Sequence, residues 1–318
     1  MKALMIGEGP VSIGIGASLK GGGIEVDFLI TENPKTCKQI RENGIKRSGK
    51  FREITVPAGA VGAFDAFEKL PQQAYDFILI ASAVNKNEEN AARLDFMRGC
   101  RKKDAPIIFL QEGLGCDEAF LPYFTEKNCY HSRILTDFEA VSEWESRIIM
   151  HQDDVLLGTC YRNILGKIAP VAEALYESGL PTSMDTEIEA AIWTQIIQSS
   201  VLGPISAVLG RNVGELADSE YSKNIIDILI EEAFAIMTAA GKSCEFETAD
   251  DFRENLMKAA EKEMKDYCPL MLRDIVNKKC TNVESVTGML LRLAGKYGVD
   301  CPVSTLLYWE LKAIEEEL

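Results

Sequence analysis

The stretch that decides the fold opens the chain: Ala3-Leu-Met-Ile-Gly-Glu-Gly-Pro-Val-Ser12, followed by a helical run that stops at three glycines, residues 21–23. Its first four residues are apolar, as in a strand buried in a parallel sheet. Glu25–Ile30 has the pattern of a second strand. Strand, loop, helix and strand together span about 30 residues, the length of a βαβ unit. The chain is therefore expected to begin as an α/β fold.

The loop between the first strand and its helix reads Gly-x-Gly-x-x-Ser, with Gly7, Gly9 and Ser12 at the fixed places. In dinucleotide-binding folds the first glycine allows a tight turn, the second lets the backbone approach a pyrophosphate, and the third place needs a small side chain. Pro10 can open the helix, whose amino terminus attracts phosphate. We predict that Gly7, Gly9, Pro10, Val11 and Ser12 bind a pyrophosphate; the alternative is a tight turn without a ligand.

Charged residues near this loop bear on which dinucleotide would bind. Glu8 lies inside the loop and has to point away from the phosphates, or it weakens binding. At the end of the second strand, Glu32 favours NAD, because an acidic residue there bonds the ribose 2′-hydroxyl. Thr31, Asn33 and Lys35 could instead hold the 2′-phosphate of NADP. These residues leave both cofactors open.

Two further buried strands are predicted at residues 75–81 and 105–110, and each ends in a polar or glycine-rich turn, residues 82–86 and 111–115. Loops at the carboxyl ends of such strands hold the ligand in open α/β sheets. Residues 147–150 and 154–157 are interpreted as late strands that complete this sheet. The prediction is a Rossmann-type, doubly wound parallel sheet over residues 1–180.

The strand pattern stops after residues 179–184, which are interpreted as the crossing into an all-helical domain, residues 181–318. A helix is expected from near Glu187, with Gln195 and Ser199 one turn apart on its apolar face. The apolar run 225–237, stopped by Gly241, predicts a central buried helix. Three more helices are predicted: one from Thr248 to about Tyr267, one from a capping box at Thr281–Glu284 to Gly298, and one after Pro302.

The composition excludes several classes of function. The chain has 318 residues, 47% of them hydrophobic, and a net charge of −15, which repels phosphate backbones and argues against nucleic acid as a partner. Nine widely spaced cysteines without a CxxC motif indicate scattered thiols in a reducing cytoplasm, and two histidines are too few for an imidazole-rich metal site. No signal peptide and no apolar run of about 20 residues is recognised, so a membrane is not an expected partner.

Several segments, in their order and spacing, resemble the ketopantoate reductase family over essentially the whole chain. Besides the glycine loop they are residues 39–45, 111–115 (Gln-Glu-Gly-Leu-Gly), 192–193, 203–207 (Gly-Pro-Ile-Ser-Ala), 272–274, Gly288 and 297–302. The resemblance implies a Rossmann domain, a helical domain and an active cleft between them, where NADPH reduces a 2-oxo acid to a 2-hydroxy acid. In that family a helix-borne lysine polarises the ketone and supplies the proton, asparagines position substrate and lysine, and a glutamate binds substrate hydroxyls.

At the positions where the family carries these groups, this sequence carries others. The lysine falls on Gln195, the two asparagines on Ser199 and Gly203, and the glutamate on Asn282. The asparagine that follows Gln111 in the family is Glu112 here.

Two positions near the cofactor also differ from the family. The lysine that ends the third buried strand falls on Ala83, with Lys86 shortly after it, and the 2′-phosphate arginine falls on Thr31. Glutamine can donate a hydrogen bond but cannot act as a general acid, so reduction would need another proton donor in place of Gln195. Glu112 and Lys86 are the candidates, unless both are merely solvated loop residues.

The leading hypothesis is an NAD(P)-dependent reductase or dehydrogenase acting on a small 2-oxo or 2-hydroxy acid other than ketopantoate. The candidate catalytic residues are Gln195, Ser199, Asn282 and Glu112. The residues expected at the adenosine and nicotinamide riboses are Thr31, Lys35, Gln111 and Gly113. NADP is the expected cofactor, and NAD is left open. The pairing of two copies into a homodimer is also left open. The alternative hypothesis is a catalytically silent sensor of nicotinamide nucleotides.

Overall fold

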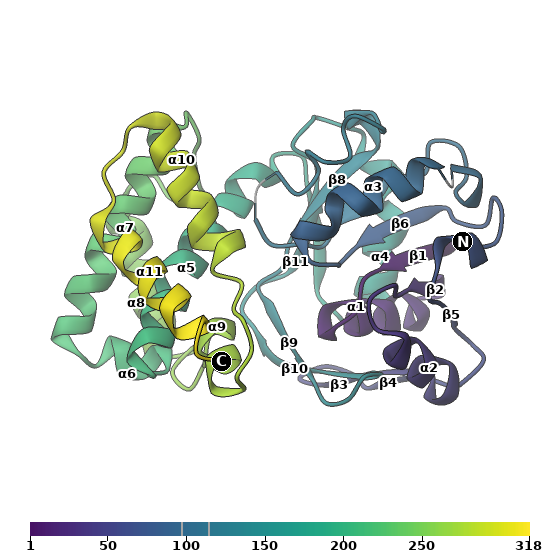
Figure 1. Cartoon of the computed structure of the whole chain (residues 1–318), viewed down its shortest axis with the longest axis horizontal. Helices are drawn as coiled ribbons and strands as arrows, with labels where there is room; N and C mark the ends of the chain where they lie inside the picture. The colour runs from purple at the N-terminus through teal and green to yellow at the C-terminus, as the bar shows by residue number, and fades with distance from the viewer. Residues whose placement is uncertain (97, 114) are drawn as a thin grey trace. The chain divides into compact units, whose positions relative to one another are not determined.

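The computed structural model describes every residue of the chain except Met97 and Leu114. The chain divides into two compact units: unit 1, residues 1–111 and 115–188, and unit 2, residues 112–114 and 189–318. Unit 1 contains the strands and unit 2 is helical, which confirms the predicted fold class (Figure 1). Glu112 and Gly113 follow a strand of unit 1 in the chain but belong to unit 2.

The main sheet of unit 1 has eight strands within the described chain, in the order β12-β11-β8-β7-β6-β1-β2-β5. Neighbours pair in parallel except β8 and β11, which are antiparallel. The strands are β1 (Lys2–Ile6), β2 (Glu25–Leu29), β5 (Gly62–Phe64), β6 (Phe77–Ile80), β7 (Ile107–Phe109), β8 (Cys129–Arg133), β11 (Val155–Gly158) and β12 (Thr182–Asp185). Because β2 and β6 flank β1, the strand order switches at β1, where open α/β sheets bind ligands.

Apolar cores cover both faces of the main sheet. Successive side chains of β1 pack into the two cores in turn. Ala3 and Met5 belong to the first core, and Leu4 and Ile6 belong to the second. The first core takes in α1 (Pro10–Gly21), α2 (Pro34–Asn43) and α4 (Ala169–Glu177), and the second takes in α3 (Asn87–Phe96). The 3-10 helices of unit 1 are η1 (Phe67–Lys69), η2 (Val84–Lys86), η3 (Arg98–Cys100), η4 (Glu126–Asn128) and η5 (Leu165–Lys167). Burial on both faces explains why β1 is apolar at successive positions.

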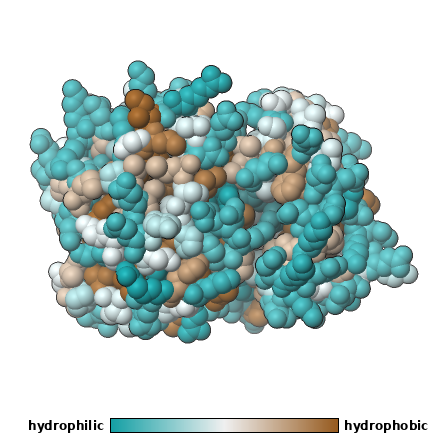
Figure 2. Space-filling view, turned by 180° about the vertical axis from the view of Figure 1, so that it is seen from behind, coloured by the Kyte–Doolittle hydropathy of each residue, from teal (hydrophilic) through white to brown (hydrophobic). Residues whose placement is uncertain are grey.

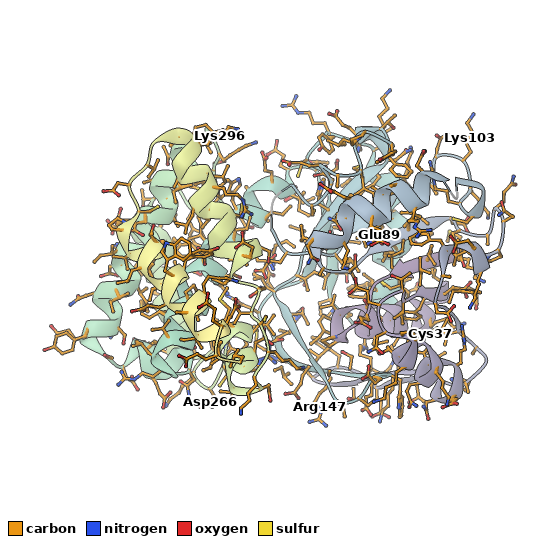
Figure 3. The ribbon with its side chains drawn as sticks, in the orientation of Figure 1. Cys37, Glu89, Lys103, Arg147, Asp266 and Lys296 are labelled. Carbon is orange, nitrogen blue, oxygen red and sulfur yellow. The ribbon has the colours of Figure 1, made fainter. Side chains whose placement is uncertain are left out.

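A second sheet of unit 1, in the order β4-β3-β10-β9, corrects the prediction for residues 147–150. Its strands are β3 (Ile45–Gly49), β4 (Ile54–Val56), β9 (Thr136–Ala140) and β10 (Glu145–His151). It packs on α1 so closely that a Cβ on Gly14 would lie 2.4 Å from the Phe138 ring. In β10, Ile148 is buried while Arg147 is exposed and points away from the sheet (Figure 3). Such alternation marks a sheet with one solvated face, not a strand of the doubly covered main sheet.

The segment 179–184 also differs from its prediction as a connecting crossing. Thr182–Asp185 forms β12, the edge strand of the main sheet, which pairs in parallel with β11. This strand was not recognised from the sequence because its residues are mostly polar. An edge strand does not need the apolar run of a central strand.

Unit 2 is built around α5 (Ile188–Leu209), which is buried along most of its length. By length and composition alone α5 could cross a membrane, but 78% of its most apolar window is buried inside the protein, as is usual for a core helix. The central helix expected at residues 225–237 is α7 (Glu220–Ala239), and it exposes one side, including Ile228. Hydrophilic side chains cover most of the face seen in Figure 2, in keeping with the net charge of −15.

The remaining elements of unit 2 include the three further helices that were predicted, together with short ones that were not. They are α6 (Val213–Ala217), α8 (Ala249–Glu261), α9 (Leu270–Val276), the π-helix η6 (Glu284–Gly288), α10 (Met289–Tyr297) and α11 (Pro302–Glu315). The hydroxyl of Thr248 accepts from the Asp251 N–H, 3.1 Å away, and so caps α8. The helix ends at Glu261, not near Tyr267 as expected.

The capping box predicted at Thr281–Glu284 does not form. The Glu284 carboxylate accepts hydrogen bonds from Arg292 at 2.5 Å and Tyr308 at 2.6 Å. The Thr281 N–H instead donates to Glu315 of α11, 2.7 Å away. Partners from further along the chain, Arg292, Tyr308 and Glu315, thus replace the local pairing that the four-residue pattern predicted.

Candidate functional site

The predicted glycine loop joins β1 to α1, and its two glycines have different physical roles. Gly7 and Gly9 have φ angles of +126° and +101°, which residues with a Cβ rarely adopt. A Cβ on Gly7 would lie 2.4 Å from the backbone nitrogen of Ser82, whereas a Cβ on Gly9 would meet nothing within 4 Å. Gly7 therefore permits close packing against the loop after β6, and Gly9 leaves open space in which a ligand can approach the backbone.

The start of α1 is suited to an anion. Pro10 occupies the first turn, and among the described residues no side chain caps the helix. The first N–H groups of an uncapped helix have no partner within the helix and attract negative charge. Ser12 is fully buried, which agrees with the need for a small side chain at the third fixed place. Val11 is half-buried in the same turn.

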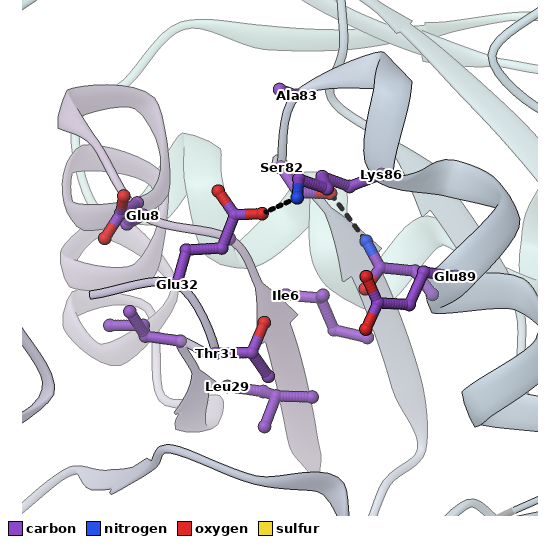
Figure 4. Close-up of a pocket in the computed structure, with 12 residues that line it drawn as sticks. Ile6, Glu8, Leu29, Thr31, Glu32, Ser82, Ala83, Lys86 and Glu89 are labelled. Carbon is purple, nitrogen blue, oxygen red and sulfur yellow. Dashed lines mark hydrogen bonds and ion pairs between the residues drawn. The ribbon is translucent and has the colours of Figure 1, made fainter. Parts of the chain in front are cut away.

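A pocket of about 190 Å³ lies beside this loop, within unit 1 (Figure 4). It is bounded by the carboxyl ends of β1, β2 and β6 and by the start of α3. Its lining residues are Ile6, Gly7, Glu8, Leu29, Ile30, Thr31, Glu32, Ser82, Ala83, Lys86, Glu89 and Asn90. The pocket thus lies at the switch in strand order, as expected for a ligand site in this kind of sheet.

Charges of both signs line the pocket. Glu32, just after β2, forms an ion pair with Lys86 at 2.6 Å (Figure 4). Glu8 is also part of the lining. Burial raises the pKa of the Glu8 carboxyl, and the nearby carboxylates of Glu32 and Glu143 raise it further. The neutral form of Glu8 is therefore favoured more than in water.

The three residues proposed to cradle a 2′-phosphate do not converge on the pocket. Thr31 lines it. Asn33 caps α2 instead: its side-chain oxygen accepts from the N–H groups of Lys35 at 3.2 Å and Thr36 at 3.4 Å. Lys35 is exposed in the first turn of α2 and is not part of the lining.

Gln111 ends β7 and links two loops of unit 1. Its amide nitrogen donates to the Ser82 carbonyl at 2.5 Å and to Asn87 at 2.8 Å, and its oxygen accepts from Asn87 at 2.9 Å. The Asn90 amide in turn donates to the Ser82 hydroxyl at 2.9 Å. Asn87 and Asn90 were not predicted as site residues. Their signal was two asparagines about one turn apart, directly after the polar end of a strand.

Three of the four candidate catalytic residues meet within unit 2. The Glu112 carboxylate accepts hydrogen bonds from the Ser199 hydroxyl and, at 3.3 Å, from the Asn282 amide. Gln195 lies one turn before Ser199 on α5 and is 8% exposed. Gly113 has a φ of +113°, and a Cβ there would lie 3.4 Å from the Ser285 carbonyl. Glu112 is thus held by donors from α5 and from the segment before η6; Leu114 of the same loop lies outside the described residues.

Comparison with known proteins shows similarity over the whole chain. The family model described as "Ketopantoate reductase PanE/ApbA" matches residues 3–159, and its "C terminal" counterpart matches residues 187–315. The 2-dehydropantoate 2-reductase of Aquifex aeolicus is 26% identical over 99% of this chain and 97% of its own. That of a Nostoc species is 22% identical over 99% of this chain and 95% of its own.

Solved structures share the fold. D-mandelate dehydrogenase in a ternary complex with NADH and anilino(oxo)acetate has a TM-score of 0.86 at 18% identity, covering 100% of this chain and 99% of that one. A PanE/ApbA family ketopantoate reductase from Ralstonia eutropha has a TM-score of 0.83 at 19% identity, with the same coverage. Nothing in these similarities supports the alternative hypothesis of a silent nucleotide sensor, since the relatives are named as oxidoreductases. From the two matching family models and the shared fold, we conclude that this chain belongs to the ketopantoate reductase family.

Proposed function

We propose that this chain is a nicotinamide-dependent oxidoreductase that interconverts a small 2-hydroxy acid and the corresponding 2-oxo acid. The observation that carries the proposal is the glycine loop: open space at Gly9, an uncapped α1 and a pocket at the carboxyl ends of three parallel strands. The names of the relatives support the reaction class, and one related structure contains NADH with an oxo-acid derivative.

The lining of the pocket favours NAD over NADP, the cofactor first expected. Glu32 stands where an acidic residue accepts from a ribose 2′-hydroxyl. A 2′-phosphate would bring further negative charge to a pocket that already holds Glu8 and Glu32, with Lys86 already paired to Glu32. Lys35 is not in the lining to receive it. We therefore expect NADH to bind more tightly than NADPH.

Glu112 is the residue best suited to handle the substrate proton. Two neutral donors, Ser199 and Asn282, bind its carboxylate and hold it in place. An ionised carboxylate can accept the proton of a substrate hydroxyl as the alcohol is oxidised, and return it during reduction. The nicotinamide, when bound, supplies or accepts the hydride. Gln195 would contribute a neutral hydrogen bond to the substrate oxygen.

The substrate is expected to differ from ketopantoate. Gln195 and Asn282 occupy the positions where the family resemblance places a lysine and a glutamate. The carboxylate of this group is therefore on the loop after β7, at Glu112, and no lysine accompanies it at the Gln195 position. A different arrangement of charge selects a different 2-oxo acid.

The test is an absorbance assay of NAD⁺ reduction with a panel of 2-hydroxy acids, and of NADH oxidation with the matching 2-oxo acids, ketopantoate included. We expect turnover on at least one acid. The Glu112→Gln substitution should lower kcat by roughly 100-fold or more, the typical contribution of a general base, while the Kd for NADH stays unchanged. Glu254→Gln, an exposed glutamate on α8, serves as the matched control. No turnover on any acid, or an unchanged kcat in Glu112→Gln, would refute this function.

A further inference from the structure

A buried group of metal-binding side chains lies in unit 1 and shares no residue with the pocket lining. Cys116, Asp117 and His131 each offer one ligand atom, and these atoms all lie within 4.8 Å of one another. The three residues are 3%, 4% and 5% exposed. Cys116 and Asp117 follow the loop after β7, and His131 lies in the middle of β8. The fold thus brings together two segments that are well separated in the chain.

The imidazole of His131 is held in place but not fully satisfied. Its Nε2 lies 3.2 Å from a carboxylate oxygen of Asp117, and the Phe109 ring stacks on it with centroids 5.7 Å apart. Its buried Nδ1 has no hydrogen-bond partner among the described residues. An ion shared with Asp117 would bind at Nε2, which faces that carboxylate, and Nδ1 would keep the proton of the ring.

Two further side chains complete the surroundings of this group. The Tyr161 hydroxyl donates to the same oxygen of Asp117 that faces His131. Cys160, next to Tyr161 in the chain and only partly buried, raises the pKa of His131 and of Cys116 and so lies near this group, though outside the 4.8 Å cluster. One thiol, an imidazole and a carboxylate therefore gather around one buried point, with a second thiol, that of Cys160, beside them.

We propose that Cys116, Asp117 and His131, with Cys160 as the fourth donor, bind one zinc ion. Sulfur, imidazole nitrogen and carboxylate oxygen are the ligands that zinc takes in four-coordinate sites. The ion would tie the loop after β7 to β8 and to the segment after β11, so its role is structural. The loop it anchors carries Gln111 and Glu112 at its start.

Cobalt(II) is the probe for this site, because it replaces zinc and reports its ligands by absorbance. The full chain in a Cys280→Ser background, which removes the exposed thiol, is stripped with a chelator and titrated with Co²⁺. We expect a sulfur-to-cobalt charge-transfer band and strong visible bands of tetrahedral geometry, saturating at one equivalent and abolished by added Zn²⁺.

Substitutions assign the bands to these residues. Cys116→Ser and His131→Gln should each weaken Co²⁺ binding at least tenfold. Cys37→Ser, a buried cysteine of the same unit that lies in α2, should bind like the parent chain. Circular dichroism tests whether each variant is folded. If a variant does not fold, the rise in the Tm of the parent chain on adding Zn²⁺ is measured in its place. Absence of thiolate bands in the parent chain, or full binding in both folded variants, overturns the proposal.

Discussion

At the scale of single residues, Glu8 is the feature that fits the glycine loop least well. Its side chain lines the pocket, and burial together with neighbouring carboxylates raises its pKa. A charged Glu8 opposes a pyrophosphate, whereas a neutral Glu8 does not. The protonation state of this one residue should therefore modulate cofactor affinity.

This gives a pH-dependent prediction. A carboxyl with a raised pKa is neutral below that value and charged above it, so the affinity for NADH should be highest at acid pH and weaken as pH rises through the pKa of Glu8. Glu8→Gln should bind NADH a few-fold more tightly at neutral pH and lose this dependence. The measurement is a series of fluorescence titrations across pH, with the exposed Glu42→Gln as control. Identical pH profiles for Glu8→Gln and the parent chain would contradict the role given to Glu8.

Single residues also show where sequence reasoning ends. Arg47 lies in the alternating strand β3, is fully buried, and donates to the Ser18 hydroxyl at 2.5 Å and to the Arg52 and Ser178 carbonyls, both at 2.9 Å. Two of these partners, Ser18 and Ser178, lie far from Arg47 in the chain. A buried charge is satisfied by groups that only the fold brings together, so it cannot be recognised from a local pattern.

At the scale of elements, the two glycines of the β1–α1 turn should respond differently to the same substitution. Both would be strained as alanine, by about 1–3 kcal/mol, because of their positive φ angles. Gly7→Ala should destabilise the chain well beyond this, since its Cβ would collide with the backbone of Ser82. Gly9→Ala should remain folded but lose NADH binding, because its Cβ would occupy the open space beside α1.

Urea unfolding and NADH titration separate these two effects. We expect the larger shift in the unfolding midpoint for Gly7→Ala and the loss of binding at a near-parental midpoint for Gly9→Ala. If Gly9→Ala binds NADH as the parent does, the loop is only a tight turn and the ligand site lies elsewhere.

A second prediction at this scale concerns the junction of α7 and α11. The buried Glu232 accepts from the N–H groups of Val303 at 2.9 Å and Ser304 at 2.8 Å, which lie in the first turn of α11. Glu232→Ala would leave both half-buried donors without this partner, so the free energy of unfolding should fall by about 2 kcal/mol. Glu310→Ala, an exposed glutamate on α11, is the control. Equal denaturant midpoints for the two variants would show that the cap contributes little.

How well an element could be predicted depended on its burial. β1, β2, β6 and β7 are covered on both faces, so their apolar runs were recognised close to their true bounds. The second sheet and β12 were missed, because one solvated face or an edge position leaves a weaker pattern. The start of α8 was predicted correctly because Thr248 caps it locally, whereas the capping box at Thr281–Glu284 was wrong because Glu284 bonds to residues further along the chain.

At the scale of the whole molecule, the candidate site illustrates the same limit. The glycine loop is continuous in sequence and is recognisable there. The contacts of Glu112 with Ser199 and Asn282 join three distant segments, and only the family resemblance gives a reason to group them from sequence. The Glu32–Lys86 ion pair was not predicted, although each of the two residues is a candidate by itself.

The central claim is that unit 1 binds a nicotinamide dinucleotide, and that the chain prefers the form without a 2′-phosphate. The decisive measurement is a fluorescence titration of the purified chain with NADH and, separately, with NADPH at neutral pH. We predict saturable binding of NADH, with a Kd at least about tenfold lower than that for NADPH. Tighter binding of NADPH would contradict the role given to Glu32, and no saturable binding of either would contradict the dinucleotide site itself.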